Sequence, residues 1–278
     1  MYFKVLSLFL VIQFVSYGLW YGVQARHQKP DLKPVSQTMS APQAVIVNSA
    51  KEQYDLSHVR FAARTEDKGY RLMNADKKQE LASVLHKLPT SHTGSLRNLI
   101  LDYDPKAHRG LGGRQIIILR AVNMEAEERI GVLIHEIGHV VDLGKLTESE
   151  KKKRSEFNDG KKPVYEGDPS LNFYRINWKD DKNRKKTAGN LDFVSGYAMS
   201  DPFEDFAETY VYYVLHNKDF KSKTHASNAL YKKYQFMKEK VFNGMEFDTG
   251  DYVKTDDVNR RPWDITVLSY DLQKFLST

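Results

Sequence analysis

The 278-residue chain contains no cysteine. This absence excludes a disulfide framework and any cysteine-ligated zinc site, so a bound metal would need histidine, aspartate or glutamate ligands. Internal repeats are also absent, and the glycine-bearing stretch "RGLGG" lacks the lysine pattern of a phosphate-binding loop. The chain does have 41% hydrophobic and 12% aromatic residues, which is typical of a globular protein with one large or two small domains.

No sequence motif for DNA or RNA recognition accompanies the positive charge of the chain. The net charge of +6 is modest, and much of it comes from residues 144–190, where 13 Lys or Arg face eight Asp or Glu. A nucleic-acid groove is one interpretation of this basic stretch, and a solvated loop is the other. We expect the loop and no nucleic-acid partner.

Residues 1–25 carry an apolar run over residues 5–23, directly after a lysine. One interpretation is a signal peptide, with Val23 and Ala25 at the small-residue positions of a cleavage site. A second is an uncleaved membrane anchor, because the run is nearly long enough to span a bilayer. A buried soluble helix is the third. The first two predict an extracytoplasmic protein, secreted or anchored to the membrane by residues 5–23.

A polar linker follows over residues 26–50, where proline and serine occur without periodicity. The remaining residues, 51–278, are expected to form the folded domain. Helical spacing of apolar residues predicts helices over 75–89, 123–144, 195–216 and 229–242, followed by an irregular tail. Asn123 and Asp201 are the predicted caps of the second and third helices, and Gly144 is the predicted end of the second.

Two β-rich runs lie at residues 96–104 and 114–121, and "RGLGG" lies between them. We interpret the glycines as a hairpin-like turn. The second run is a candidate edge strand, against which an extended peptide could lie by strand addition.

The stretch "VLIHEIGHVV", residues 132–141, places two histidines four residues apart in an apolar helix. On such a helix His135 and His139 project side by side and can hold one Zn²⁺ at ~2.0–2.1 Å. Glu136, one step round, can act as a general base. The alternative is a buried helix with satisfied histidines. Burying two histidines and a glutamate without partners is costly, and a metal supplies partners.

A catalytic zinc site has three protein ligands, so a third ligand is required. A histidine six residues after His139 is excluded, because that position is Lys145. The predicted helix over 195–216 offers Glu204 and Glu208, which are four apart on one side. A surface helix with solvated acids is the alternative. Glu204 could also form a capping box with Asp201, which would leave Glu208 as the ligand.

The HExxH stretch followed by "SGYAMSDPFEDFAETY" resembles the catalytic domain of anthrax lethal factor and the related clostridial Pro-Pro endopeptidases. The resemblance covers roughly residues 50–245 and is specific over 132–142 and 195–210. It implies an α+β, zincin-like zinc metallopeptidase domain over residues 51–278. In such a domain a small sheet packs on the active-site helix, and the C-terminal part is mostly helical. The basic stretch 144–190 departs from the family, so substrate specificity cannot be carried over.

The resemblance also implies roles for individual side chains. The three Zn²⁺ ligands would be His135, His139 and Glu204, as in gluzincins. Glu136 would transfer the proton from water to the leaving amine, and Tyr197 would donate to the oxyanion. Glu208 or Asp142 would orient a ligand histidine. Tyr197 as an ordinary core aromatic remains the alternative.

These patterns predict an exported or membrane-anchored zinc endopeptidase that hydrolyses peptide or protein substrates. The alternative is a catalytically inactive, peptidase-like binding or stalk protein at the cell surface. The complete set of ligands, base and tyrosine favours the enzyme, because a decayed peptidase commonly loses its base or a ligand.

Overall fold

The computed structural model describes residues 55–65, 69–146, 153–250 and 261–277. The predicted leader and linker, residues 1–25 and 26–50, lie outside them. Within the described ranges, no helix is long and apolar enough to cross a membrane. The described chain is a mixed α/β structure with one five-stranded sheet, a two-stranded hairpin and a set of packed helices.

The main sheet has the strand order β2-β1-β3-β5-β4. Its three central strands run parallel: β1 (Arg60–Thr65), β3 (Asn98–Asp102) and β5 (Ile116–Arg120). The antiparallel edge strands are β2 (Gly69–Leu72) and β4 (Gly110–Gly112). Nearly continuous apolar runs such as "NLILD" and "IIILR" are typical of central parallel strands.

The topology corrects two predictions about the β-rich runs. Strands β3 and β5 are parallel neighbours, so no hairpin joins them; the hairpin lies one strand later, between β4 and β5. The "RGLGG" stretch is therefore partly a strand, and β5 is not an edge strand, because β4 covers its outer side. The sequence does not mark β4 as a strand, because its three residues, two of them glycines, show no apolar alternation.

The predicted helices are confirmed, with changes at their ends. They are α1 (Ala75–Leu85), α3 (Ala126–Val140), α5 (Pro202–Leu215) and α7 (Asn228–Phe236). Two of them continue as π-helical turns, Val141–Lys145 and Met237–Val241. The remaining helices are α2 (Thr90–Thr93), α4 (Ser170–Asn177), α6 (Asn217–Lys223) and α8 (Leu272–Ser277). The tail after α7 is thus not wholly irregular.

Asp201 caps α5 as predicted, but Asn123 does not cap α3. Asn123 has a positive φ of 55° and lies in the preceding turn, so the helix begins later, after Glu125, without a side-chain cap. Gly144 lies inside the π turn and does not end the helix. A short polar residue tolerates the left-handed region, which explains why an asparagine suits the turn as well as a cap.

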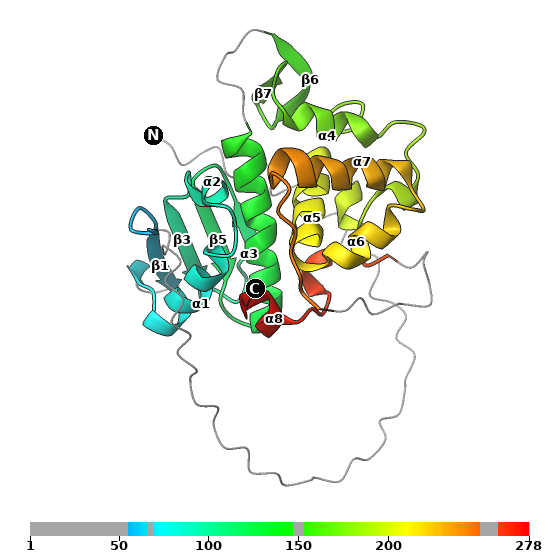
Figure 1. Cartoon of the computed structure of the whole chain (residues 1–278). Coiled ribbons are helices and arrows are strands. Elements are labelled where there is room, and N and C mark those ends of the chain that lie inside the picture. Colours follow the sequence, from blue (N-terminus) through cyan, green and yellow to red (C-terminus); the bar gives the residue numbers. More distant parts are fainter. Residues whose placement is uncertain (1–54, 66–68, 147–152, 251–260, 278) are drawn as a thin grey trace, which may run out of the picture. The chain divides into compact units, whose positions relative to one another are not determined.

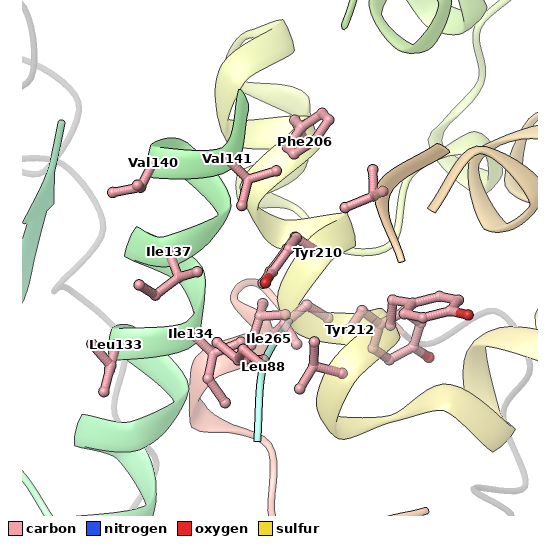
Figure 2. Close-up of a cluster of buried hydrophobic side chains, with 14 of the residues drawn as sticks. Leu88, Leu133, Ile134, Ile137, Val140, Val141, Phe206, Tyr210, Tyr212 and Ile265 are labelled. Carbon is pink, nitrogen blue, oxygen red and sulfur yellow. The ribbon is translucent and has the colours of Figure 1, made fainter. Parts of the chain in front are cut away.

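Helix α3 lies between the sheet and the helices α4–α7 (Figure 1). The side of α3 that faces away from the sheet packs on α5. Apolar residues form this contact, among them Ile134 of α3, Val141 of the π turn after it and Phe206 of α5 (Figure 2). The two helices approach closely at Gly138, where an added Cβ would lie 3.0 Å from Cα of Ala207. The HExxH helix is therefore held on both sides, and α5 is brought next to it.

The basic stretch 144–190 was expected to be a solvated loop, and this is wrong for part of its length. It forms a hairpin of β6 (Arg154–Asp159) and β7 (Lys162–Tyr165), followed by α4. Its buried aromatic residues join the core: Phe157, Phe173, Tyr174 and Trp178. Most of the described charged side chains lie at the surface. The high content of charged residues predicted a loop, although the aromatic residues between them are buried.

Candidate metal centre

His135 and His139 lie on one face of α3, and Glu204 faces them from the first turn of α5. One ligand atom from each of the three residues lies within 4.8 Å of the others. Oε2 of Glu204 lies 3.2 Å from Nε2 of His135 and 3.5 Å from Nε2 of His139. Sequence positions 65 residues or more apart are thus brought together.

The donor set fits a tetrahedral zinc ion. Ligand atoms at ~2.0–2.1 Å from a tetrahedral metal lie about 3.3–3.4 Å from one another, close to the two separations in the cluster. Oε2 of Glu204 is also buried without a hydrogen-bond partner among the described residues. A buried carboxylate oxygen without a partner is costly, and a cation between the three atoms would remove that cost.

Burial by itself would raise the pKa of the Glu204 carboxyl, but the neighbouring His139 and His135 bring it well below its usual range. Burial would likewise lower the pKa of His135, while the carboxylates of Glu204 and Glu208 raise it well above the ordinary value. The cluster therefore pairs a carboxylate anion with positive charge on the imidazoles, and a bound divalent cation would take the place of the imidazole proton.

Glu208, one turn after Glu204, holds His135 from behind. Its Oε1 lies 3.0 Å from Nδ1 of His135. Its Oε2 accepts hydrogen bonds from the Ser195 hydroxyl at 2.6 Å and the Ile265 backbone N–H at 3.0 Å. Because a carboxylate with these partners accepts from Nδ1–H, Nε2 of His135 is left free to bind a metal.

The alternative role of Glu204, in which its side chain bonds back to the start of α5, does not agree with the structure. The Asp201 carboxylate accepts hydrogen bonds from the backbone N–H groups of Phe203 and Glu204, both at 2.9 Å. The side chain of Glu204 is directed to the two histidines instead of back to the helix start. The cap thus fixes the first turn of α5, from which Glu204 projects.

Glu136 is packed under the edge strand β4. Burial raises the pKa of its carboxyl, and the backbone of Gly112 provides a hydrogen bond to it. A Cβ at Gly112 would lie 2.5 Å from Oε2 of Glu136, and a Cβ at Gly110 would overlap Oε1. Glycine at both positions therefore makes room for the carboxylate.

Tyr197 lies in a 3₁₀ turn (Tyr197–Met199) beside the histidines. Its ring stacks on that of His135 with centroids 6.1 Å apart. Burial raises the pKa of its hydroxyl, and the charge of Glu204 raises it further, so the phenol stays protonated. The tyrosine borders the metal centre and is not part of a remote aromatic cluster.

Asp142 lies three residues after His139, in the π-helical turn that follows α3. Its buried carboxylate accepts a hydrogen bond from the Tyr174 hydroxyl at 2.6 Å. Burial raises the pKa of this carboxyl to about 7. Asp142 thus connects the end of the HExxH helix to α4 in the basic stretch, whereas the carboxylate that contacts a histidine of the cluster is that of Glu208.

Several supporting groups escaped the sequence analysis. They are Ser195, the glycines of β4, and residues 261–266, a segment of the tail. In this segment Trp263 C=O accepts from the Tyr197 N–H at 2.7 Å, and Ile265 reaches Glu208. Arg109, next to β4, binds Asp264 at 2.5 Å. No motif marks such residues, because they act mostly through backbone groups or from far along the chain.

A family model described as "Putative zinc-binding metallo-peptidase" matches residues 120–266, more than half of the chain. The matched range begins at the end of β5 and extends into the 261–266 segment, so it includes the cluster of His135, His139 and Glu204. No curated protein and no solved structure matches the chain.

Proposed function

The chain belongs to this family of zinc-binding metallopeptidases, and on that premise we propose that it is a zinc endopeptidase of the HExxH-plus-glutamate, gluzincin type. The observation that carries the proposal is the convergence of His135, His139 and Glu204, with Glu136 alongside. These three side chains would hold the ion. A bound zinc would act as a Lewis acid and lower the pKa of water, which supplies a nucleophile at neutral pH.

The residues around the ligands have roles that follow from their surroundings. Glu136 takes a proton from the attacking water and gives it to the leaving amine, a task for which a raised carboxyl pKa is suited. Tyr197, kept protonated, donates its hydroxyl hydrogen to the oxyanion that develops on the scissile carbonyl. Glu208 holds the imidazole of His135 in the required orientation.

We also propose that the domain is zincin-like and related to the lethal-factor group. The support is the HExxH helix between a small sheet and a helical part, together with the order Tyr197, Glu204, Glu208. The hairpin of β6 and β7 and helix α4, which lie in the basic stretch, are the features by which this chain would differ from that group.

Metal analysis combined with a peptide library tests the proposal. Protein lacking residues 1–25 and purified without chelator should carry about one zinc per chain and cleave peptides. Glu136→Gln should keep the zinc and lose nearly all turnover, because the base is not a ligand. Zinc binding without any cleavage would instead favour the inactive binding or stalk protein. A protein that takes up no zinc when it is supplied would contradict the zinc endopeptidase.

We further propose that the protein acts outside the cytoplasm on peptide or protein substrates and does not bind nucleic acid. The apolar run over residues 5–23, followed by a polar linker, supports export or anchoring. A reporter fused after residue 50 should be active in the extracytoplasmic compartment. The same fusion without residues 1–25 is the control and should remain inside. Cytoplasmic activity of the first fusion would contradict the proposal.

A further inference from the structure

A cavity of about 300 Å³ lies beside Tyr197, and nothing in the proposed chemistry uses it. One side of the cavity is lined by Gly196 and Met199. In the sequence these two residues lie on either side of Tyr197 and Ala198. Leu191 lines another side of the cavity, and Arg261 and Trp263 of the 261–266 segment complete it. The cavity is thus built from the segments that carry the oxyanion donor.

The 261–266 segment is fixed against Tyr197 by its backbone. The N–H of Gly196 donates to Pro262 C=O at 3.0 Å, and the N–H of Tyr197 donates to Trp263 C=O at 2.7 Å. The Trp263 ring packs on Gly196 so closely that an added Cβ would lie 2.5 Å from a ring carbon. The cavity wall and Tyr197 therefore form one hydrogen-bonded unit.

The position of the cavity suits a subsite for substrate. Gly196 and Tyr197 are neighbours in the chain, with Cα atoms about 3.8 Å apart. Each residue of an extended peptide advances about 3.3 Å. A side chain within about three residues of the scissile bond can therefore reach the cavity while the carbonyl lies at Tyr197.

Two of the lining side chains are large, apolar and exposed. Trp263 is 65% exposed and Leu191 is 45% exposed. The tryptophan is held in place by the contacts just described, so binding a ligand on it costs little conformational entropy. Rigid exposed aromatic residues of this kind are common anchors at binding sites.

Arg261 gives the cavity its charge. Its Nη1 is buried and has no hydrogen-bond acceptor among the described residues, and no carboxylate of those residues forms an ion pair with it. Burial lowers the pKa of its guanidinium, and the charge of Asp192 offsets this only in part. The two oxygens of Asp192 already accept hydrogen bonds, from the Ser227 hydroxyl at 2.6 Å and the Gly189 N–H at 2.8 Å. A carboxylate bound in the cavity would pair with the guanidinium of Arg261, which lines it.

We propose that this cavity is a substrate subsite that selects an acidic side chain, Asp or Glu, within three residues of the cleaved bond. The proposal rests on the endopeptidase function proposed above and names its substrate class. The carboxylate would pair with Arg261, and the methylene groups would pack on Trp263 and Leu191. The net charge of +6 also favours approach of acidic peptides.

The test compares matched peptides that differ only in Glu or Gln at each position around the cut. For the unaltered protein, kcat/KM should be about 10–100-fold higher with Glu at one position, the range expected of a charged hydrogen bond. Arg261→Gln should remove this preference, and Arg261→Glu should reverse it in favour of Lys. Arg261→Lys should keep most of it, and thermal melting of each variant reports whether it is folded. The matched control is Arg71→Gln, which removes an exposed arginine from β2, the edge strand opposite β4.

Binding to the inactive Glu136→Gln protein, measured by calorimetry with the same peptides, separates the two proposals. A Glu-over-Gln preference that is lost in Glu136→Gln/Arg261→Gln supports the subsite, even if no peptide is ever cleaved. If no peptide is cleaved but the binding preference for Glu is intact, only the proposed endopeptidase function is overturned. Cleavage or binding without an acidic preference, or a preference that survives in Arg261→Gln, overturns the subsite. Absence of both cleavage and binding overturns both.

Discussion

At the scale of single residues, the two glutamates of α5 have separate positions that can be tested separately. Glu204 faces Nε2 of both histidines, whereas Glu208 contacts Nδ1 of His135. Glu204→Ala should abolish tight zinc binding, because one of three protein ligands is lost. Glu208→Ala should weaken zinc affinity by about 10–100-fold, the usual effect of removing a group that orients a ligand. Zinc titration against a competing chelator measures both.

Glu208→Gln sharpens the comparison, because it keeps the size of the side chain. Its amide has one acceptor oxygen, and its N–H₂ group can only donate, so it cannot satisfy all three donors that Glu208 satisfies: the Ser195 hydroxyl, the Ile265 N–H and the His135 ring. It should therefore weaken zinc binding almost as much as Glu208→Ala. If Glu208→Ala lost the metal while Glu204→Ala kept it, the ligand would be one helical turn further along.

At the scale of elements, the four longest helices could be predicted, but the shorter helices and the packing around them could not. Asn74 and Asp201 cap α1 and α5 through local hydrogen bonds, and such signals lie within a few residues of the helix they start. The ligands were predictable for the same reason, since helical spacing places His135 and His139 on one face. The parallel pairing of β3 with β5 depends on contacts between distant residues, which local periodicity does not report.

Strand β4 and helix α3 form a unit that positions the base, and Gly112→Ala tests it. The new methyl group would lie 2.5 Å from Oε2 and 2.9 Å from the backbone oxygen of Glu136, so the carboxylate or the strand must move. We expect kcat to fall by about 10²-fold, as displacement of about 1 Å can cause, while zinc affinity changes much less. Metal content and kcat are measured on the same preparation.

Gly113→Ala is the matched control, because its Cβ would meet nothing nearer than a methyl carbon of Ile116 at 3.7 Å. It should retain kcat within a few-fold. Equal losses in both variants would mean that the strand tolerates no side chain anywhere, and that the space for Glu136 is not the cause.

At the scale of the whole molecule, the candidate site is held together by contacts between segments that are far apart in the sequence. Arg109 binds Asp264 and Thr266, Ile265 binds Glu208, and Trp263 binds the backbone of Tyr197. The sequence analysis identified the groups that do chemistry, because their residue types and spacing are distinctive. It missed the 261–266 segment, whose contribution comes largely from backbone groups that any residue could provide.

The stability of the whole molecule should depend on His92, which joins α2 to α5 and to the turn after α7. His92 is fully buried, with Nε2 2.8 Å from Val241 C=O and Nδ1 2.8 Å from the Tyr210 hydroxyl. Because a carbonyl can only accept, Nε2 carries the hydrogen and Nδ1 accepts from the tyrosine, so the ring is neutral. Burial lowers its pKa to about 3.

The unfolded chain therefore takes up a proton at His92 below pH ~6.5, whereas the folded protein does not until pH falls to about 3. The free energy of unfolding should fall by up to about 1.4 kcal/mol per pH unit across this window from His92 alone. Urea unfolding at several pH values, with chelator present so that zinc release does not contribute, measures this slope. His92→Gln, which can still donate to Val241, should be less stable at pH 7 and lose stability less steeply, so the two curves converge as the pH falls. Parallel curves would show that the buried ring is not the source of the pH dependence.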